Sequence, residues 1–224
     1  MFATWVNQQH LTRCSNQIFR KKIYNLVELK PAINPTYQSI LDAAERLFSE
    51  RGYAAVKLQE IARAVSLRHT SLYYYVPAGK EQLYIEVMER NFNRHRDGLT
   101  DAIIRAGDDF RAQMHAVAEW FALQPPINFG QIVRSDMPAI SQRHAYRLTE
   151  LSIESLRLPI ASALRRALDK GLVSMRDVDF AAMSIVGFLQ TAHNIPPRYA
   201  PSEKERVTLA KAMADTLLDG WLKR

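Results

Sequence analysis

The 224-residue chain has one cysteine and no long apolar run. Cys14 cannot form a disulfide within one chain, which fits a reducing compartment such as the cytoplasm. No stretch approaches the roughly 18 uninterrupted apolar residues of a membrane span, so we expect a soluble protein with no membrane partner. Long alternation of apolar and polar residues is absent, which disfavours strands.

Sequence signals of catalysis and of metal binding are also missing. The chain contains no glycine-rich phosphate-binding loop and no nucleophile elbow. Five histidines lack a carboxylate or cysteine partner at the spacing of metal ligands: His69, His95, His115, His144 and His193. We therefore predict that the protein is not an enzyme and has neither a metal site nor a cofactor.

Positive charge is concentrated in the first third of the chain. The formal charge is +7, and residues 1–35 contribute +4 of it, whereas residues 97–224 contribute +1. Such a distribution is typical of a polyanion-binding segment, and equally of a solvated basic face. We expect residues 1–33 to be a basic N-terminal extension that increases affinity for such a polyanion.

Three short helices are predicted between residues 34 and 83. Asn34 is a good N-cap and Pro35 is tolerated in a first helical turn, so a helix should begin here and end at Gly52. Two further helices are expected at 58–65 and 69–76, the last one stopped by a Pro-Ala-Gly sequence. This size and rhythm are typical of a helix-turn-helix unit.

Residues 84–224 predict a larger helical domain. Residues 127–140 have no clear pattern, and Pro159 is expected to kink or break its helix. Ser174 with Asp177, and Ser202 with Glu205, are interpreted as capping boxes. The predicted fold class is all-α, with later helices at about 80–103, 109–123, 141–170, 177–194 and 203–222.

Fixed spacings within residues 36–83 are similar to those of one family. They are Ile40-Leu-Asp-Ala-Ala-Glu-Arg-Leu-Phe-Ser-Glu-Arg-Gly-Tyr53, Glu60-Ile-Ala62 and Leu72-Tyr-Tyr-Tyr-Val-Pro-Ala-Gly-Lys-Glu-Gln-Leu83. With these motifs the chain resembles the tetracycline-repressor (TetR) family of bacterial transcriptional regulators, and Ala167-Leu-Asp-Lys-Gly-Leu-Val173 is similar to a later region of that family. The resemblance implies a repressor that binds a palindromic operator as a homodimer and is released by a small molecule. It also implies that residues 34–83 bind DNA and that residues 84–224 form an effector-binding and dimerisation domain.

The predicted helix at 69–76 is expected to enter the major groove of double-stranded DNA. Leu72 and Val76 would pack inward, and outward residues would contact base edges: His69, Thr70, Ser71 and Tyr73. The resemblance assigns phosphate contacts to Tyr74, Tyr75 and Lys80. Two cations just before predicted helices, Lys57 and Arg68, can also reach phosphates. The alternative is that the tyrosines are amphipathic core residues and that the polar residues merely face solvent.

Three features depart from the family pattern. Ser66 occupies a tight turn where glycine is usual, so the turn must tolerate a side chain or avoid a positive φ. Lys57 and Arg68 replace N-cap Ser or Thr residues, a loss of about 1 kcal/mol each. Pro-Ala-Gly-Lys is one residue longer than the common spacing, which puts the phosphate contact of Lys80 in doubt.

An effector of unknown identity is expected to bind in the larger domain, because small-molecule pockets are mostly apolar with a few polar anchors. Each candidate residue is also typical of ordinary core. The candidates are Trp120, Phe121, Phe129, Met137, Tyr146, Phe188 and His193.

Two apolar stripes predict a four-helix dimer interface, although both could instead pack inside one subunit. On 177–194 the stripe is Ala181, Ile185, Phe188, Leu189 and Ala192, and on 203–222 it is Val207, Ala210, Met213, Leu217 and Trp221.

Two other classes of function remain open on the sequence. A helical enzyme or carrier could have an N-terminal region that imitates a DNA-binding unit, and the basic segment could belong to an RNA-binding module. Salt-dependent binding to a palindromic DNA duplex would distinguish a regulator from both.

Overall fold

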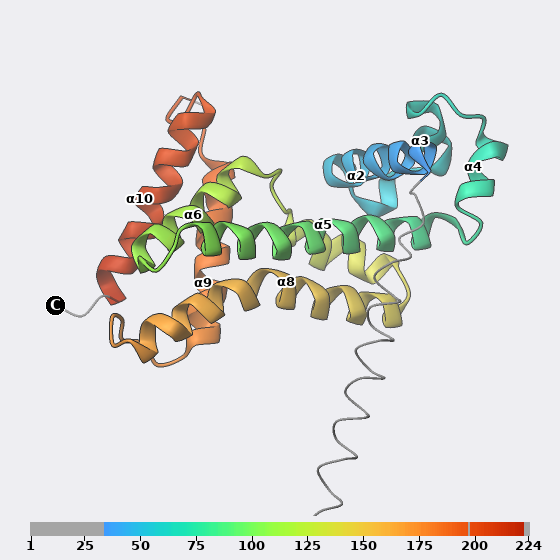
Figure 1. Ribbon diagram of the computed structural model, residues 1–224. Helices are drawn as coiled ribbons and strands as arrows, with labels where there is room; N and C mark the ends of the chain where they lie inside the picture. Colours follow the sequence, from blue (N-terminus) through green and yellow to red (C-terminus); the bar gives the residue numbers. More distant parts are fainter. Residues whose placement is uncertain (1–33, 197, 222–224) are drawn as a thin grey trace, which may run out of the picture. The chain divides into compact units, whose positions relative to one another are not determined.

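A computed structural model describes residues 34–196 and 198–221, and over this part of the chain the all-α fold is confirmed (Figure 1). The chain divides into two compact units, residues 1–39 and 40–224. The predicted basic extension, residues 1–33, lies outside the described residues. The main helices are α2 (Pro35–Ala55), α3 (Leu58–Ala64), α4 (His69–Tyr75), α5 (Gly79–Arg105), α6 (Phe110–Leu123), α7 (Phe129–Gln131), α8 (Gln142–Asp169), α9 (Val178–Gln190) and α10 (Glu203–Trp221).

The start of α2 belongs to the first unit, and its described part is residues 34–39. The side chain of Asn34 accepts a hydrogen bond from the backbone N–H of Thr36 at 2.9 Å. The hydroxyl of Ser39 donates to the carbonyl of Pro35 at 3.1 Å. The predicted N-cap at Asn34 is therefore confirmed.

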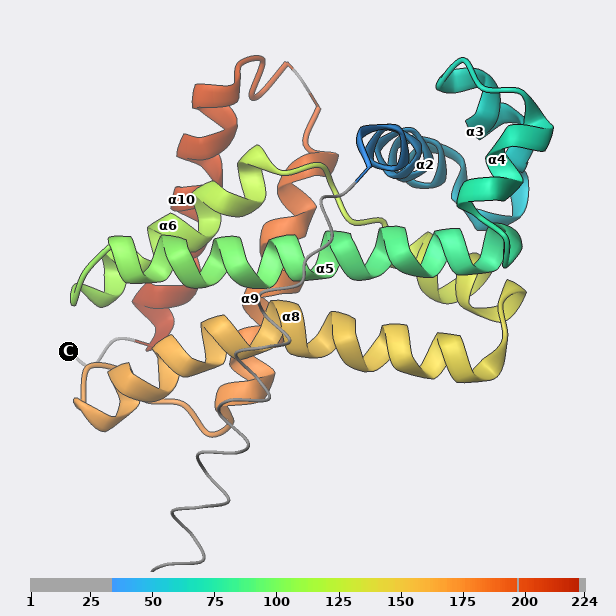
Figure 2. The same cartoon turned by 45° about the vertical axis from the view of Figure 1, so that its right-hand side comes forward.

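Two left-handed residues shape the helix-turn-helix in the second unit. Gly52, with φ of 77°, interrupts the helical path of α2 where the sequence predicts its end, and a last short turn continues to Ala55. Ser66 has φ of 58°, so the turn after α3 keeps the conformation that favours glycine although a side chain is present. The N–H of Leu67 donates to the carbonyl of Ala62 at 2.8 Å across this turn, so α4 follows α3 directly (Figure 2).

The long helix α5 links the helix-turn-helix to the rest of the second unit. It runs from Gly79 to Arg105, so the predicted domain boundary at 83/84 falls inside one continuous helix. Helix α8 lies beside α5 in all three ribbon views (Figure 1). Pro159 is predicted to kink or break its helix; it does not break it, because α8 continues through Pro159. Among the described helices, none is long and apolar enough to cross a membrane.

The helix starts show which side chains cap the helices. Asp109 caps α6 by accepting from the N–H of Ala112 at 2.9 Å, and Ser202 and Glu205 form the predicted reciprocal pair before α10. The capping box predicted from Ser174 to Asp177 is wrong. Asp177 is itself the N-cap of α9, because its carboxylate accepts from the N–H groups of Asp179 and Phe180.

Residues 127–140, which had no clear pattern, form a chain of short turns. After α7 come a π-helical turn, η1 (Ile132–Asp136), and a 3-10 turn, η2 (Met137–Ala139). A third short turn, η3 (Thr191–Asn194), follows α9. Single turns of different pitch explain why no single periodicity is visible in the sequence.

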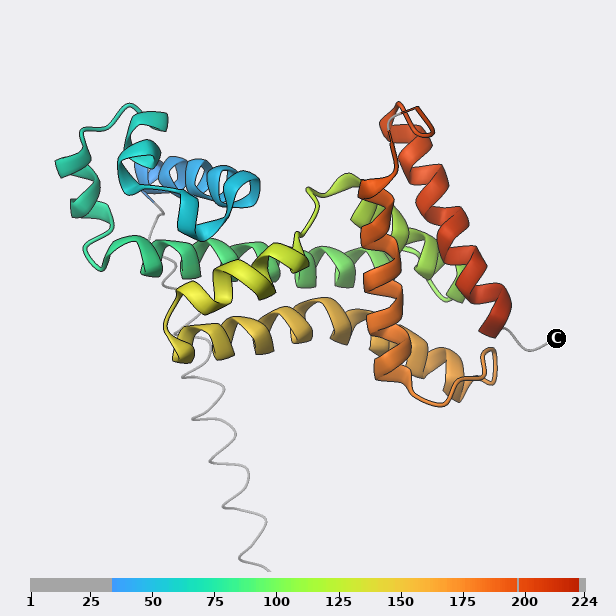
Figure 3. The ribbon, with the colours of Figure 1, turned by 180° about the vertical axis from the view of Figure 1, so that it is seen from behind.

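The main core lies among α6, α8, α9, α10 and the end of α5 (Figure 3). Helix α10 packs along α6 and also contacts α9. Gly98 of α5 allows α6 to approach α5 closely, because a Cβ atom at Gly98 would lie 1.9 Å from the Trp120 ring. The large side chains buried in the core include Leu99, Met114, Phe121 and Leu156.

Candidate nucleic-acid interface

Helix α4 has one buried side and one exposed side. Leu72 and Val76 are buried, as predicted from the sequence. At 100° per residue, Thr70, Ser71 and Tyr74 point away from these two residues. Tyr74 is the most exposed of the three tyrosines at 83%, against 46% for Tyr73. Tyr74 therefore shares its face with the predicted base-reading residues.

The rings on α4 order one another. The ring centroids of His69 and Tyr73 lie 5.1 Å apart in an edge-to-face arrangement. Tyr74 and Tyr75 form a similar pair at 5.2 Å. Edge-to-face aromatic pairs are favourable beyond their buried area, so these rings restrict each other's rotamers. His69 and Tyr73 together offer one ordered polar edge beside Thr70.

Exposed cations surround α4. Lys57 and Arg68 occupy the N-cap positions of α3 and α4, as the sequence predicts, and neither side chain caps its helix. The structure adds Arg63, which is exposed in the last turn of α3 and was not singled out from the sequence. Within the described part of the chain, none of these three side chains forms an ion pair. Their charges are available to an external anion.

The start of α3 receives its cap from a later residue. The carboxylate of Glu60 accepts from the backbone N–H of Lys57 at 2.9 Å, and Arg51 holds the same carboxylate at 2.7 Å. The hydrogen bond from Arg51 and that from Lys57 keep the pKa of Glu60 below its usual value. Glu60 thus supplies one half of a capping box, by satisfying the N–H of Lys57, and the side chain of Lys57 stays exposed.

Lys80, a predicted phosphate ligand, is engaged inside the protein. Its ammonium donates to the carbonyls of Tyr53 at 2.9 Å and Val56 at 3.1 Å, and lies 4.2 Å from the centre of the Tyr53 ring. Burial lowers the pKa of Lys80. The structure therefore gives Lys80 the role of a cap for the end of α2, and we leave it out of the proposed DNA contacts.

A cluster of five residues, here called the junction cluster, joins the end of α2 to α5 and η1. It consists of Gly52, Tyr53, Lys80, Tyr84 and Asp136. The carboxylate of Asp136, which is 3% exposed, accepts from the N–H of Tyr53 at 2.9 Å and from the hydroxyl of Tyr84 at 3.1 Å. Burial, and then the charge of Asp136, raise the pKa of Tyr84. Tyr84 therefore acts as a neutral donor that satisfies Asp136.

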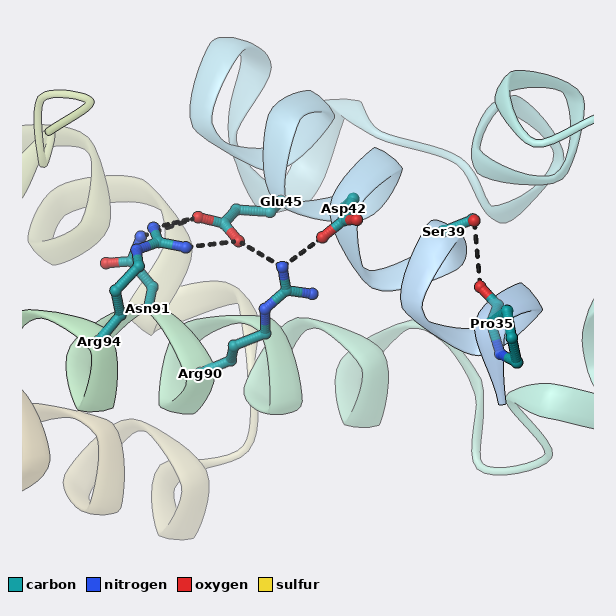
Figure 4. Close-up of polar contacts among 7 residues, drawn as sticks. All are labelled: Pro35, Ser39, Asp42, Glu45, Arg90, Asn91 and Arg94. Atoms are coloured by element: carbon teal, nitrogen blue, oxygen red, sulfur yellow. Dashed lines mark hydrogen bonds and ion pairs between the residues drawn. The ribbon is translucent and has the colours of Figure 1, made fainter. Parts of the chain in front are cut away.

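A cavity of about 440 Å³, here called the junction cavity, lies next to this cluster. Its walls come from residues 42–50 of α2, 84–94 of α5 and the segment 125–136. Glu45 accepts from Arg94 at 2.5 Å and from Asn91 at 3.1 Å, and Arg90 bonds Asp42 (Figure 4). Burial alone would raise the pKa of Glu45. The hydrogen bonds from Arg94 and Asn91 outweigh this effect and lower the pKa.

The predicted effector residues are not gathered around this cavity. The Trp120 indole donates to Nδ1 of His95 at 3.2 Å, and Phe121 is buried in the core with its carbonyl 2.9 Å from Nε2 of His193. Tyr146 is 70% exposed on α8. Phe129, Met137 and Phe188 are half-buried. No member of the set is among the described residues that line the junction cavity.

Much of the predicted dimer stripe is inside one chain, and its assignment is corrected. Ala181, Ile185, Leu189, Ala192 and Ala210 are buried, and Val207, Met213 and Leu217 pack against the core. Phe188 is half-buried, and the side chain of Trp221 lies outside the described residues. The exposed face of α9 carries other residues, Phe180, Met183 and Gly187. Periodicity had identified the buried face because that face is also apolar.

Comparison with known proteins supports the helix-turn-helix assignment. Residues 40–87 match the family described as bacterial regulatory proteins, tetR family. The biofilm operon icaADBC HTH-type negative transcriptional regulator IcaR of Staphylococcus epidermidis is 37% identical over 70 residues. Those residues are 31% of this chain, and the chain spans 35% of the length of that relative.

Solved structures share the fold over most of the chain. The fatty acid degradation regulator FadR of Bacillus halodurans is similar over 84% of this chain and 96% of its own, with a TM-score of 0.65 and 20% identity. AibR, solved in complex with isovaleryl coenzyme A and operator DNA, is similar over 80% of this chain and 97% of its own, with a TM-score of 0.59 and 20% identity. Over residues 40–87 the sequence is therefore similar to the tetR family of bacterial regulatory proteins, and the described chain shares the all-helical fold of these solved structures.

Proposed function

We propose that the protein is a transcriptional regulator of the repressor type, which binds double-stranded DNA through α4. The observation that carries the proposal is the exposed polar face of α4, surrounded by three cations that lack ion pairs within the described residues. A helix can enter the major groove and present hydrogen-bonding groups to base edges. Cations beside it neutralise phosphates and release counterions.

The two kinds of contact are divided between two sets of residues. His69, Thr70 and Ser71 read bases, with Tyr73 and Tyr74 at the edge of the groove. Lys57, Arg63 and Arg68 contact phosphates, which positions α4 without reading sequence. Tyr75 is half-buried beside Tyr74 and contributes chiefly through packing.

Two copies of the chain bind a palindromic operator. Two reading helices must be about 34–36 Å apart, or a multiple of that distance, to meet successive major grooves on one side of DNA. We place the dimer contact on the exposed face of α9, where Phe180 is 73% exposed and a Cβ atom added at Gly187 would meet no atom within 4 Å among the described residues. The glycine permits close approach of a second helix, and the exposed aromatic ring supplies apolar surface to bury.

Repression and release by a small molecule are carried over from relatives. The similar regulator IcaR is named a negative regulator, and AibR was solved with both an acyl coenzyme A and operator DNA. For this chain we propose the same class of behaviour, with an effector of its own.

Salt-dependent binding tests the DNA proposal. A duplex selected by the wild type from a random library is titrated at several salt concentrations beside a scrambled duplex and an RNA duplex. Replacing Lys57, Arg63 and Arg68 with Gln should reduce the slope of log affinity against log salt by about 0.9 for each phosphate that is no longer neutralised. Replacing Arg105, Arg166 and Arg176 with Gln is the matched control, because these body residues are also exposed and have no ion pair within the described residues.

The result expected is a reduced slope in the first triple variant alone. An equal slope in both variants would remove α3 and α4 from the interface. Preference for the RNA duplex would favour an RNA-binding module instead.

The dimer contact is tested separately by light scattering. Phe180→Glu with Met183→Glu should yield monomers, because an apolar interface cannot accommodate unpaired charges. Ile104→Glu, on an exposed residue of α5, is the control and should leave the dimer intact. A wild type that is monomeric at micromolar concentration would contradict the proposed dimer. A double variant that remains dimeric would show that the interface lies elsewhere than on the exposed face of α9.

A further inference from the structure

The junction cavity has the size and the walls of a small-molecule site. Its volume of about 440 Å³ falls within the range of about 300–1,000 Å³ typical of ligand pockets. Much of its wall is apolar, from Phe48, Val87, Met88, Ile127 and Ile132. Such walls favour an apolar molecule over water.

The charged groups of the wall are largely neutralised by one another. Glu45 is bound by Arg94 and Asn91, and Asp42 by Arg90 (Figure 4). Asp136 is satisfied by the N–H of Tyr53 and the hydroxyl of Tyr84. The two remaining ionic residues of the wall, Arg46 and Glu50, are exposed and opposite in sign. The pairing of Arg90 and Arg94 leaves no buried cation among the described wall residues for an anionic ligand, so an uncharged ligand fits better than an anion.

The segment that closes the cavity also holds the end of the first DNA-binding helix. Gln131, Ile132 and Asp136 all line the cavity. A Cβ atom at Gly52 would lie 2.2 Å from Nε2 of Gln131 and 3.0 Å from the carboxylate of Asp136. This close approach places the backbone of residues 52–53 directly against the segment that a ligand would displace.

We propose that the junction cavity binds an uncharged, mainly apolar small molecule, and that Asp136 transmits its binding to the DNA-binding helices. A ligand that moves η1 lengthens the Asp136–Tyr53 contact and releases the end of α2. The orientation of α3 and α4 on DNA then changes. This coupling rests on the proposed DNA-binding function, whereas the binding site itself does not.

Linkage gives the proposal a reciprocal signature. If the ligand lowers DNA affinity by some factor, DNA must lower ligand affinity by the same factor. Couplings of this kind are typically about 5–150-fold. Both directions are therefore measured.

The site is tested with the uncharged fluorescent probe N-phenyl-1-naphthylamine. Ile132→Trp fills the cavity and should weaken probe binding at least ~10-fold. Val133→Trp is the matched control, because Val133 is the next residue, is exposed and does not line the cavity. Ile127→Trp fills the same space from another position and replaces Ile132→Trp if thermal unfolding shows that the latter is not folded.

The charge preference is tested with 8-anilino-1-naphthalenesulfonate, which has the same ring system and one negative charge. The binding that is lost in Ile132→Trp should be at least ~10-fold weaker for the sulfonate than for the uncharged probe. Tighter Ile132-dependent binding of the sulfonate overturns the assignment to an uncharged ligand. Absence of binding by the uncharged probe, or equal binding to wild type and to both filled variants, overturns the site.

The coupling is tested by the ratio of probe affinities with and without the selected DNA duplex. We expect a ratio of at least ~5 in the wild type. It should persist in Asp136→Asn, whose amide oxygen can accept from the Tyr53 N–H while its amide nitrogen donates to the Tyr84 hydroxyl oxygen, and approach 1 in Asp136→Ala, which keeps neither bond. A ratio near 1 in the wild type overturns the coupling, and so does a ratio in Asp136→Ala equal to that of wild type. If no duplex is bound at all, the proposed function fails, while the filled variants still decide the site.

Discussion

The helix-turn-helix and the helical body use their charges differently. In α3 and α4, Lys57, Arg63 and Arg68 have no ion pair within the described residues. In the body, Arg111 binds Asp215 and Asp219 across α6 and α10. Hydrogen bonds from His115 and Arg111 outweigh burial and keep the pKa of Asp215 lowered. The charges of the body are paired within the fold, whereas unpaired charges of one sign are suited to a partner.

The two regions also differ in how they are stabilised. The body buries a continuous core among five helices, whereas α4 buries mainly Leu72 and Val76. A seven-residue helix is not stable alone in water, so the helix-turn-helix depends on its attachment to α5. Lys80 and Tyr84 provide part of this attachment through Tyr53, Val56 and Asp136. The exposed face of α4, which is the proposed reading surface, can therefore be altered without loss of the fold, provided that the contacts of Lys80 and Tyr84 are kept.

The largest effect is expected on sequence discrimination. His69→Ala with Ser71→Ala should remove about 1–3 kcal/mol for each base contact, or roughly 2–6 kcal/mol in total, without lowering the stability of the fold. Competition between the selected and scrambled duplexes measures it. Thr100→Ala with Thr149→Ala, on exposed positions of α5 and α8, is the control. Full discrimination in the double variant of α4 would show that α4 does not read bases.

A smaller effect concerns pH and the buried His95 of the body. Burial, and then the charge of Arg94, lower the pKa of His95 to about 4. The unfolded chain binds the proton first, because its histidine has a pKa of about 6.5. Stability is thus complete above pH 6.5 and falls by roughly 3 kcal/mol as the pH drops to 4.

Urea unfolding between pH 7 and pH 4.5 measures this loss. In His95→Gln, whose side-chain oxygen can still accept from the Trp120 indole, the slope of stability against pH should be reduced. Some slope should remain, because burial also lowers the pKa of His193. A slope equal to that of wild type would assign the pH dependence to other groups.

The contacts that Lys80 makes with the end of α2 are expected to contribute less to the free energy of unfolding. Lys80→Met keeps the aliphatic stem but leaves the carbonyls of Tyr53 and Val56 without their donor, which should cost about 1–3 kcal/mol of unfolding free energy. Lys170→Met, at an exposed position after α8, is the control. Loss of DNA affinity with unchanged stability would instead identify Lys80 as a phosphate ligand.

The smallest effect is expected for the charge network of the body. Arg111→Gln breaks bonds to Asp215 and Asp219, but the groups are largely exposed and screened by water. Thermal unfolding should show a loss below about 1 kcal/mol. A greater loss would mean that α10 is held on α6 by charge rather than by its buried alanines and leucine.

Local sequence predicted the elements that depend on neighbouring residues. The N-cap at Asn34, the interruption of α2 at Gly52 and the inward positions of Leu72 and Val76 all follow from signals within one or two turns. The wrong capping box at Ser174 has a local cause as well. A serine three residues before an acid is a valid signal, but Asp177 can itself accept the first N–H groups of α9.

The amino-acid sequence by itself determined that the chain is helical and which residues of α4 face inward, because helical period and caps act over a few residues. It could not decide which apolar face of α9 is covered, since Ile185 and Phe180 belong to different faces that are both apolar. Nor could it pair Tyr53 with Asp136, 83 positions away. Side chains so distant meet through the packing of whole helices. The tertiary structure therefore decided the junction cavity, the role of Lys80 and the exposed face of α9.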